Sequence, residues 1–152
     1  MVKIEQSVLI NRPIKQVWKF MSNVEENGPK WDRGVLAARV TSDGPLGIGT
    51  TIEIRRQLLG RVRIGKIQIS NWQPPRLVTL QTKLGQATAS QSYIFESLEN
   101  GTKLRTDVNL DLIGWWKWIA PILVPMLKRD GEADLANIKR ILENMAPEEP
   151  SE

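Results

Sequence analysis

The sequence contains neither cysteine nor histidine among its 152 residues. Without cysteine the chain can form no disulfide bond and has no thiol nucleophile. Without histidine it lacks the commonest metal ligand and the commonest general base near neutral pH. These absences exclude many metal centres and most catalytic triads, and we expect no metal, no other cofactor and no conventional catalytic residue.

A long hydrophobic run is missing from the N-terminal segment, where the apolar stretch 8–10 is followed at once by Asn11 and Arg12. A secretory signal needs a longer apolar stretch, and a membrane-spanning helix needs about 20 apolar residues. We therefore expect a cytoplasmic protein.

Acidic residues are outnumbered by basic ones outside the C-terminal tail. The net charge is +4, and removing the three glutamates at 148, 149 and 152 leaves +7 for residues 1–146. We expect residues 147–152 to form a disordered acidic tail and residues 1–146 to form a single domain. A basic body favours nucleic acid, anionic lipid or an acidic small molecule as partner.

Seven runs of residues have the alternation of a β-strand, and Gly, Pro or Asn-Gly turn signals separate most of them. They span residues 3–10, 35–41, 50–59, 62–72, 77–83, 88–97 and 102–111. Close spacing of this kind is typical of an antiparallel sheet built largely from hairpins.

Helical patterns interrupt this order twice. Residues 13–23 predict a short amphipathic helix capped by Asn11, followed by a turn or second short helix that ends near Trp31. Residues 119–145 predict a long helix with an inward stripe that includes Leu135, Ile138 and Leu142, and with Lys139 on its exposed side. Its first half is apolar on nearly all sides and contains two prolines, which tend to kink a helix.

Several strings of the sequence together resemble the START/SRPBCC superfamily (Bet v 1-like helix-grip proteins), in its polyketide cyclase/dehydrase-like branch. They are INRPIKQVWKFMSNVEENGPKW, GIGTTIEIRR, NWQPPRL, SYIFESLENGTKL and LANIKRILENM. The resemblance covers residues 1–145. It implies an α+β helix-grip fold: a curved seven-stranded antiparallel sheet around a long C-terminal helix, two short helices after the first strand, and an apolar cavity. Its members include lipid and hormone carriers, pollen-allergen-like proteins and aromatic polyketide cyclases.

Two polar residues fall on strand faces that should line such a cavity. Arg56 shares its face with Ile52 and Ile54, so it either binds an anionic or carbonyl-bearing ligand or is turned to solvent by a bulge near Gly60. Tyr93 either orients a ligand carbonyl through its hydroxyl or is a core residue whose hydroxyl reaches the rim.

The Trp-rich start of the long helix should oppose these two residues. We expect Trp115, Trp118, Ile122 and Met126, with Arg56 and Tyr93 opposite, to border the entrance or upper wall of a pocket of about 300–1,000 Å³. A soluble domain rarely exposes so large an apolar patch without an interaction partner.

The run from Arg55 to Lys66 has five basic residues and no acidic one. It lacks the interleaved aromatic residues that bind single-stranded nucleic acid, and no duplex-binding motif is present. We interpret it as a solvated strand face and expect no nucleic-acid partner.

The sequence therefore favours binding or transport of a small apolar or amphipathic ligand that is lipid-, polyketide- or aromatic-like. One alternative is a polyketide cyclase/dehydratase-type enzyme that works without metal, mainly by positioning a reactive chain. A second alternative is a peripheral lipid- or membrane-binding protein. We expect a monomer or weak dimer.

Overall fold

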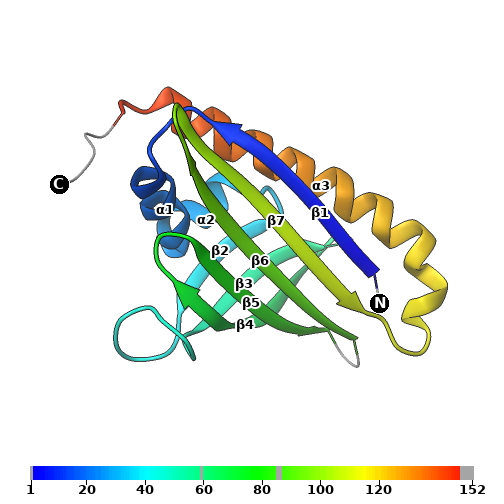
Figure 1. Cartoon of the computed structure of the whole chain (residues 1–152). Coiled ribbons are helices and arrows are strands. Elements are labelled where there is room, and N and C mark those ends of the chain that lie inside the picture. Colours follow the sequence, from blue (N-terminus) through cyan, green and yellow to red (C-terminus); the bar gives the residue numbers. More distant parts are fainter. Residues whose placement is uncertain (1, 59, 85–86, 148–152) are drawn as a thin grey trace.

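The computed structural model describes residues 2–58, 60–84 and 87–147 (Figure 1). The elements follow the order β1 (Val2–Ile10), α1 (Ile14–Ser22), α2 (Val24–Trp31), β2 (Val35–Val40), β3 (Thr51–Leu58), β4 (Arg61–Gln73), β5 (Leu77–Leu84), β6 (Ala87–Leu98), β7 (Gly101–Asp111) and α3 (Trp116–Asn144). The predicted order of strands and helices is confirmed. The expected disordered tail lies outside the described residues except for Pro147.

The seven strands form one antiparallel sheet in the order β1-β7-β6-β5-β4-β3-β2. The sheet is curved, and α3 runs alongside β1 (Figure 1). The register shifts between Val35 and Ala37 and between Ile69 and Asn71. Irregularities of this kind bend and twist a strand, which helps the sheet to curve. The structure therefore has the predicted helix-grip fold.

The turn between β6 and β7 requires glycine. A side-chain carbon built at Gly101 would collide with the backbone carbonyl of Ile10. The Asn100-Gly101 turn signal therefore also permits a close approach to the end of β1, where Thr102 Oγ1 donates a hydrogen bond of 2.8 Å to the carbonyl of Arg12.

The start of α1 differs from the prediction. Its N-cap is Pro13, not Asn11, and no side chain caps it. The backbone N–H of Asn11 instead donates to Glu143 Oε2 at 2.8 Å, near the end of α3. This bond and one from Lys139 hold the pKa of Glu143 below its ordinary value, with the Lys139 bond having the larger effect.

α3 is one helix of 29 residues, although Pro121 and Pro125 lie inside it. It begins three residues before the predicted start. Each proline removes one backbone donor, so the carbonyls of Lys117 and Pro121 lose their usual partners four residues ahead. In the described residues, none of the helices combines the length and hydropathy needed to cross a bilayer.

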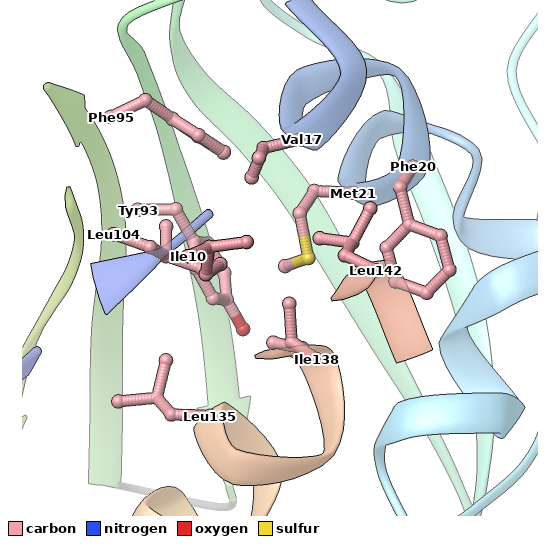
Figure 2. Close-up of a cluster of buried hydrophobic side chains, with 10 residues drawn as sticks. All are labelled: Ile10, Val17, Phe20, Met21, Tyr93, Phe95, Leu104, Leu135, Ile138 and Leu142. Carbon is pink, nitrogen blue, oxygen red and sulfur yellow. The ribbon is translucent and has the colours of Figure 1, made fainter. Parts of the chain in front are cut away.

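Two clusters of buried side chains form the core. The larger joins α1 and the second half of α3 to the concave face of the sheet (Figure 2); its buried members are Ile10, Val17, Phe20, Met21, Tyr93, Phe95, Leu104, Leu135, Ile138 and Leu142. The smaller joins the first half of α3 to β1, β6 and β7 through Ile4, Ala87, Leu110 and Leu112. Leu135, Ile138 and Leu142 are at most 4% exposed, which confirms the predicted phase of the helix.

Two polar contacts tie α3 to β1. Gln6 Nε2 donates to the carbonyl of Lys128 at 2.7 Å. Lys139 Nζ donates to the carbonyl of Leu9 at 2.6 Å and to Glu143 Oε2 at 2.7 Å. Lys139 was predicted on the exposed side of the helix, and its side chain is 42% exposed, but its flexible stem also reaches across to the neighbouring strand.

Candidate functional site

The register places Arg56 on the concave face of the sheet. It lies opposite Val35 on β2 and Arg63 on β4, and Val35 is buried. Residues paired across antiparallel strands project from the same face, and alternate residues along one strand share that face. Arg56 therefore shares its face with Ile54 and with Ile52, which is only 3% exposed.

Arg56 is held there by a two-pronged ion pair. Its Nη2 lies 3.0 Å from Asp32 Oδ2, and its Nη1 lies 3.4 Å from Asp32 Oδ1. Asp32 directly follows α2, and its Oδ1 also accepts a hydrogen bond of 3.0 Å from the backbone N–H of Gly34. A side-chain carbon at Gly34 would stand 2.9 Å from Arg56 Nη1, so glycine makes room for the guanidinium. The fork geometry fixes Arg56 and leaves its side chain 42% exposed.

Tyr93 is the second predicted residue at this place. Its ring is buried and meets Trp31 edge-to-face, with centroids 6.3 Å apart. Figure 2 shows its hydroxyl directed toward α3 near Ile138. Burial raises the pKa of Tyr93 above its ordinary value, with further increases from the charges of Asp32 and Asp134, while Arg56 lowers it. The hydroxyl thus stays protonated at neutral pH and can donate a hydrogen bond.

Asp134, on α3, is a further titratable residue that interacts with Asp32 and Arg56. Burial raises its pKa to about 7, and the negative charge of Asp32 adds to the increase, while Arg56 opposes it. Asp134 therefore titrates near neutral pH, unlike an ordinary exposed carboxylate. We call Asp32, Arg56, Tyr93 and Asp134 the polar cluster; they come from the segment after α2, from β3, from β6 and from α3.

Trp31 adds an unused donor beside the polar cluster. Its indole Nε1 is buried and has no hydrogen-bond partner within the described part of the chain. Asn137 on α3 fixes the end of α2 by donating a hydrogen bond of 3.2 Å to the carbonyl of Trp31. A buried donor without a partner costs about 1–3 kcal/mol, so an oxygen atom of a bound molecule would relieve it.

The apolar residues around the polar cluster are incompletely covered. Ile54, Ile67 and Leu80 lie on the concave face by register yet are only half-buried, whereas Phe95 and Leu104 are almost fully buried. Phe95 and Leu104 are thus covered at the end of the concave face under α1, whereas Ile54, Ile67 and Leu80 leave apolar surface accessible on the face that carries Arg56. This arrangement offers an apolar guest contact surface with donors and one near-neutral acid at one side.

Two open hollows lie elsewhere on the molecule. One, of about 390 Å³, lies between β1 and α3 and is lined by Gln6, Val8, Leu135 and neighbouring residues. The other, of about 460 Å³, lies between the α1–α2 junction and the β2–β3 loop. Neither is lined by any of the six residues that the sequence nominated.

The first half of α3 places its predicted site residues differently from Arg56 and Tyr93. Trp115, Trp118 and Ile122 are 63%, 86% and 76% exposed, and Met126 is half-buried. Their role as ligand contacts stays a prediction. The basic run on β3 and β4 is solvent-exposed at Arg55, Arg61, Arg63 and Lys66.

Sequence reasoning missed Asp32 and Asp134 as site residues. Asp134 could have been recognised from the sequence, because it is an acidic residue within the apolar stripe, beside Leu135 and one turn before Ile138. Asp32 could not have been recognised in this way, since its pairing with Arg56 depends on how the segment after α2 meets β3. In the described residues, no group of three or more acidic side chains gathers in a way that could hold a metal ion.

Comparison with known protein families shows which family the chain belongs to. The family model described as polyketide cyclase / dehydrase and lipid transport matches residues 1–143. The chain belongs to this family. No curated protein sequence matches it.

Solved structures share the fold of this family member at low sequence identity. The crystal structure of Ara h 8.0201 is 12% identical and has a TM-score of 0.74, with 95% of this chain and 99% of that chain covered. The Zhui aromatase/cyclase from Streptomyces sp. R1128 is 14% identical, with a TM-score of 0.74 and 93% of each chain covered. A protein from Thermus thermophilus, TTHA0849, is 12% identical, with a TM-score of 0.77, and the match covers 93% of this chain and 97% of that one. At these identities the likeness shows the fold alone.

Proposed function

We propose that the protein binds a small apolar molecule with a polar, oxygen-bearing end, between α3 and the concave face of the sheet. The observation that carries the proposal is the polar cluster, which shares its face with apolar residues such as Ile52, Ile54 and Leu80. A purely structural core has little use for an arginine, a near-neutral aspartate and an unpaired indole N–H in one place. The family description, which includes lipid transport, supports this class of guest.

The cluster has the donors that a carbonyl or carboxylate oxygen needs. Arg56 offers the part of its guanidinium that Asp32 does not occupy, and Tyr93 offers a hydroxyl that stays protonated. The apolar body of the guest would contact half-buried residues such as Ile54 and Leu80, with Met126 bordering the entrance. In this proposal the polar cluster orients the guest and the apolar face supplies most of the affinity.

Titration with anilinonaphthalene sulfonate, an aromatic anion that fluoresces in apolar surroundings, tests the proposal. The parent protein should bind one equivalent saturably, and Arg56→Gln should weaken binding by about tenfold, the loss expected for one charge-assisted hydrogen bond. Arg55→Gln is the matched control, because Arg55 is the next residue on β3 and faces the opposite, solvent side. Equal affinities of the two variants would place the probe off the concave face.

The same titration should depend on pH through Asp134. As pH rises from about 6 to 8 the Asp134 carboxyl loses its proton, because its pKa is raised to about 7. The new negative charge repels an anionic guest, so affinity should fall over this interval. Asp134→Asn should remove the pH dependence, and an unchanged profile in that variant would exclude Asp134 from the site.

A second candidate function is a cyclase or dehydratase acting on a polyketide-like substrate, and the pKa of Asp134 favours it. An acid with a pKa near 7 can both donate and accept a proton at neutral pH, and Tyr93 could hold the reacting carbonyl. Mass spectrometry of a poly-ketone substrate after incubation distinguishes the two functions. A carrier returns it unchanged, whereas a dehydratase returns a product lighter by one water, and Asp134→Asn should abolish that change.

A further inference from the structure

The first turns of α3 carry an exposed apolar surface. Trp118 and Ile122 lie one helical turn apart and are 86% and 76% exposed. Trp115, at the N-cap, and Ile113, two residues before it, are 63% and 48% exposed. We call these four residues the Trp–Ile face. Large apolar side chains gathered in this way on one surface usually mark a contact site.

The opposite side of this helical segment packs against the core. Ala120, Leu123, Val124 and Leu127 pack against the smaller core cluster on β1, β6 and β7. The helix cannot rotate to bury the Trp–Ile face without exposing these residues. The outward position of Trp118 and Ile122 is therefore a fixed consequence of how α3 is anchored.

Between residues 112 and 129, the segment that carries the Trp–Ile face, the charged residues are all basic. From residue 112 to residue 129 the sequence has no acidic residue, while Lys117, Lys128 and Arg129 are all exposed. The nearest acidic residues in the sequence, Asp111 and Asp130, bound this interval. A partner that meets both the apolar side chains and the cations should combine an apolar interior with a negative surface.

We propose that the Trp–Ile face docks the protein onto an anionic lipid bilayer, with the first half of α3 lying in the plane of the interface. Tryptophan suits this position because its ring is apolar and its N–H can reach water and headgroups. The exposed lysines and arginine would meet lipid phosphates and carboxylates, each contributing to binding at low salt. The docking surface uses no residue of the polar cluster, so it stands or falls independently of guest binding there.

Flotation of the full chain with lipid vesicles tests the proposal. The protein should float with vesicles of equal parts phosphatidylcholine and phosphatidylserine, and less with phosphatidylcholine alone. High salt should reduce the difference, because it screens the attraction to anionic lipid. The double variant Trp118→Ala, Ile122→Ala should need about tenfold more lipid for half-maximal binding, since two exposed apolar side chains no longer insert.

Two further variants make the test specific. Ile48→Ala is the matched control, because Ile48 is 72% exposed but belongs to the β2–β3 loop, which lies far from the start of α3 in Figure 1. It should bind vesicles as the parent does. Lys117→Glu with Arg129→Glu should lose the preference for phosphatidylserine while thermal unfolding shows that the fold is retained.

Three outcomes would overturn the proposal. In the first, the parent protein floats with neither kind of vesicle. In the second, the double variant binds vesicles as well as the parent does. In the third, light scattering shows a dimer that the double variant abolishes, with no vesicle binding, which would make a second copy of the chain the occupant of the Trp–Ile face.

Discussion

The two halves of α3 belong to one unbroken helix and yet bury their side chains in different ways. In residues 128–144 the apolar side chains lie on one side, where Leu135, Ile138 and Leu142 enter the larger core cluster. In residues 116–127 apolar side chains occupy both sides, with Leu123 and Leu127 against the sheet and Trp118 and Ile122 exposed. The difference shows that one half of the helix stabilises the core on its apolar side, whereas the other half also exposes apolar side chains to the surroundings.

Proline has little effect on this contrast. Pro121 and Pro125 both lie in the first half, but the helix continues through them because its inner residues remain packed on the sheet. Tertiary packing can outweigh the loss of two helical hydrogen bonds when the side chains on either side stay buried. The prolines therefore mark the half with weaker internal bonding without dividing the helix.

The largest difference between the halves should appear on truncating the inner face of the second half. Leu142→Ala removes a fully buried side chain and should lower the free energy of unfolding by about 2–5 kcal/mol in urea denaturation. Arg140→Ala, two residues away and exposed, should change it by no more than about 0.5 kcal/mol. Similar losses in the two variants would contradict the assigned phase of the helix.

Asp134 is a partly buried ionisable residue in the second half, so its effect on stability should depend on pH. Its pKa is raised from 3.8 to about 7, so its favourable contribution is fully present below pH 3.8 and is lost as pH rises through 7. Asp134→Asn should thus be more stable than the parent above pH 7, by about 1 kcal/mol after allowance for solvent screening. Urea denaturation at pH 5 and pH 8 should show the advantage shrinking at the lower pH; a gap independent of pH would refute the assignment.

The junction of the two halves should show coupling between Gln6 and Gly131. Gln6→Ala removes the hydrogen bond to the carbonyl of Lys128 and should cost about 1 kcal/mol. Gly131→Ala in the parent should also destabilise, since the new methyl group meets the Gln6 amide. In the Gln6→Ala background, however, Gly131→Ala should stabilise the helix by up to about 1 kcal/mol, as alanine favours helix more than glycine does. Additive effects in this double-mutant cycle would show that the two residues do not interact.

The smallest effect should come from the outer face of the first half. Trp118→Ala and Ile122→Ala should each change the free energy of unfolding by no more than about 0.5 kcal/mol, because both side chains are largely exposed. Chemical denaturation without lipid measures this directly. A loss comparable to that of Leu142→Ala would mean that the Trp–Ile face is buried in solution, against the sheet or against another copy.

The local sequence pattern was sufficient to predict the strands and helices. The alternation of residues in each strand, the turn signals between strands and the helical spacing of Leu135, Ile138 and Leu142 predicted the order of strands and helices and the side of α3 that faces the sheet. These features depend on period and turn chemistry, which neighbouring residues carry by themselves. The cap of α1 was wrongly predicted, since Pro13 takes the N-cap position and no side chain caps the helix.

Only part of the candidate site could be predicted from the local sequence pattern. Period two placed Arg56 and Tyr93 on one face, but nothing local predicted the pairing of Arg56 with Asp32 or the pKa of Asp134. Both depend on the packing of α2 and α3 against the sheet, because charge interaction and desolvation are set by distance and burial in the folded chain. The sequence by itself thus determined the strands, the helices and their apolar faces, while tertiary structure decided which polar groups meet and which apolar side chains of α3 remain exposed.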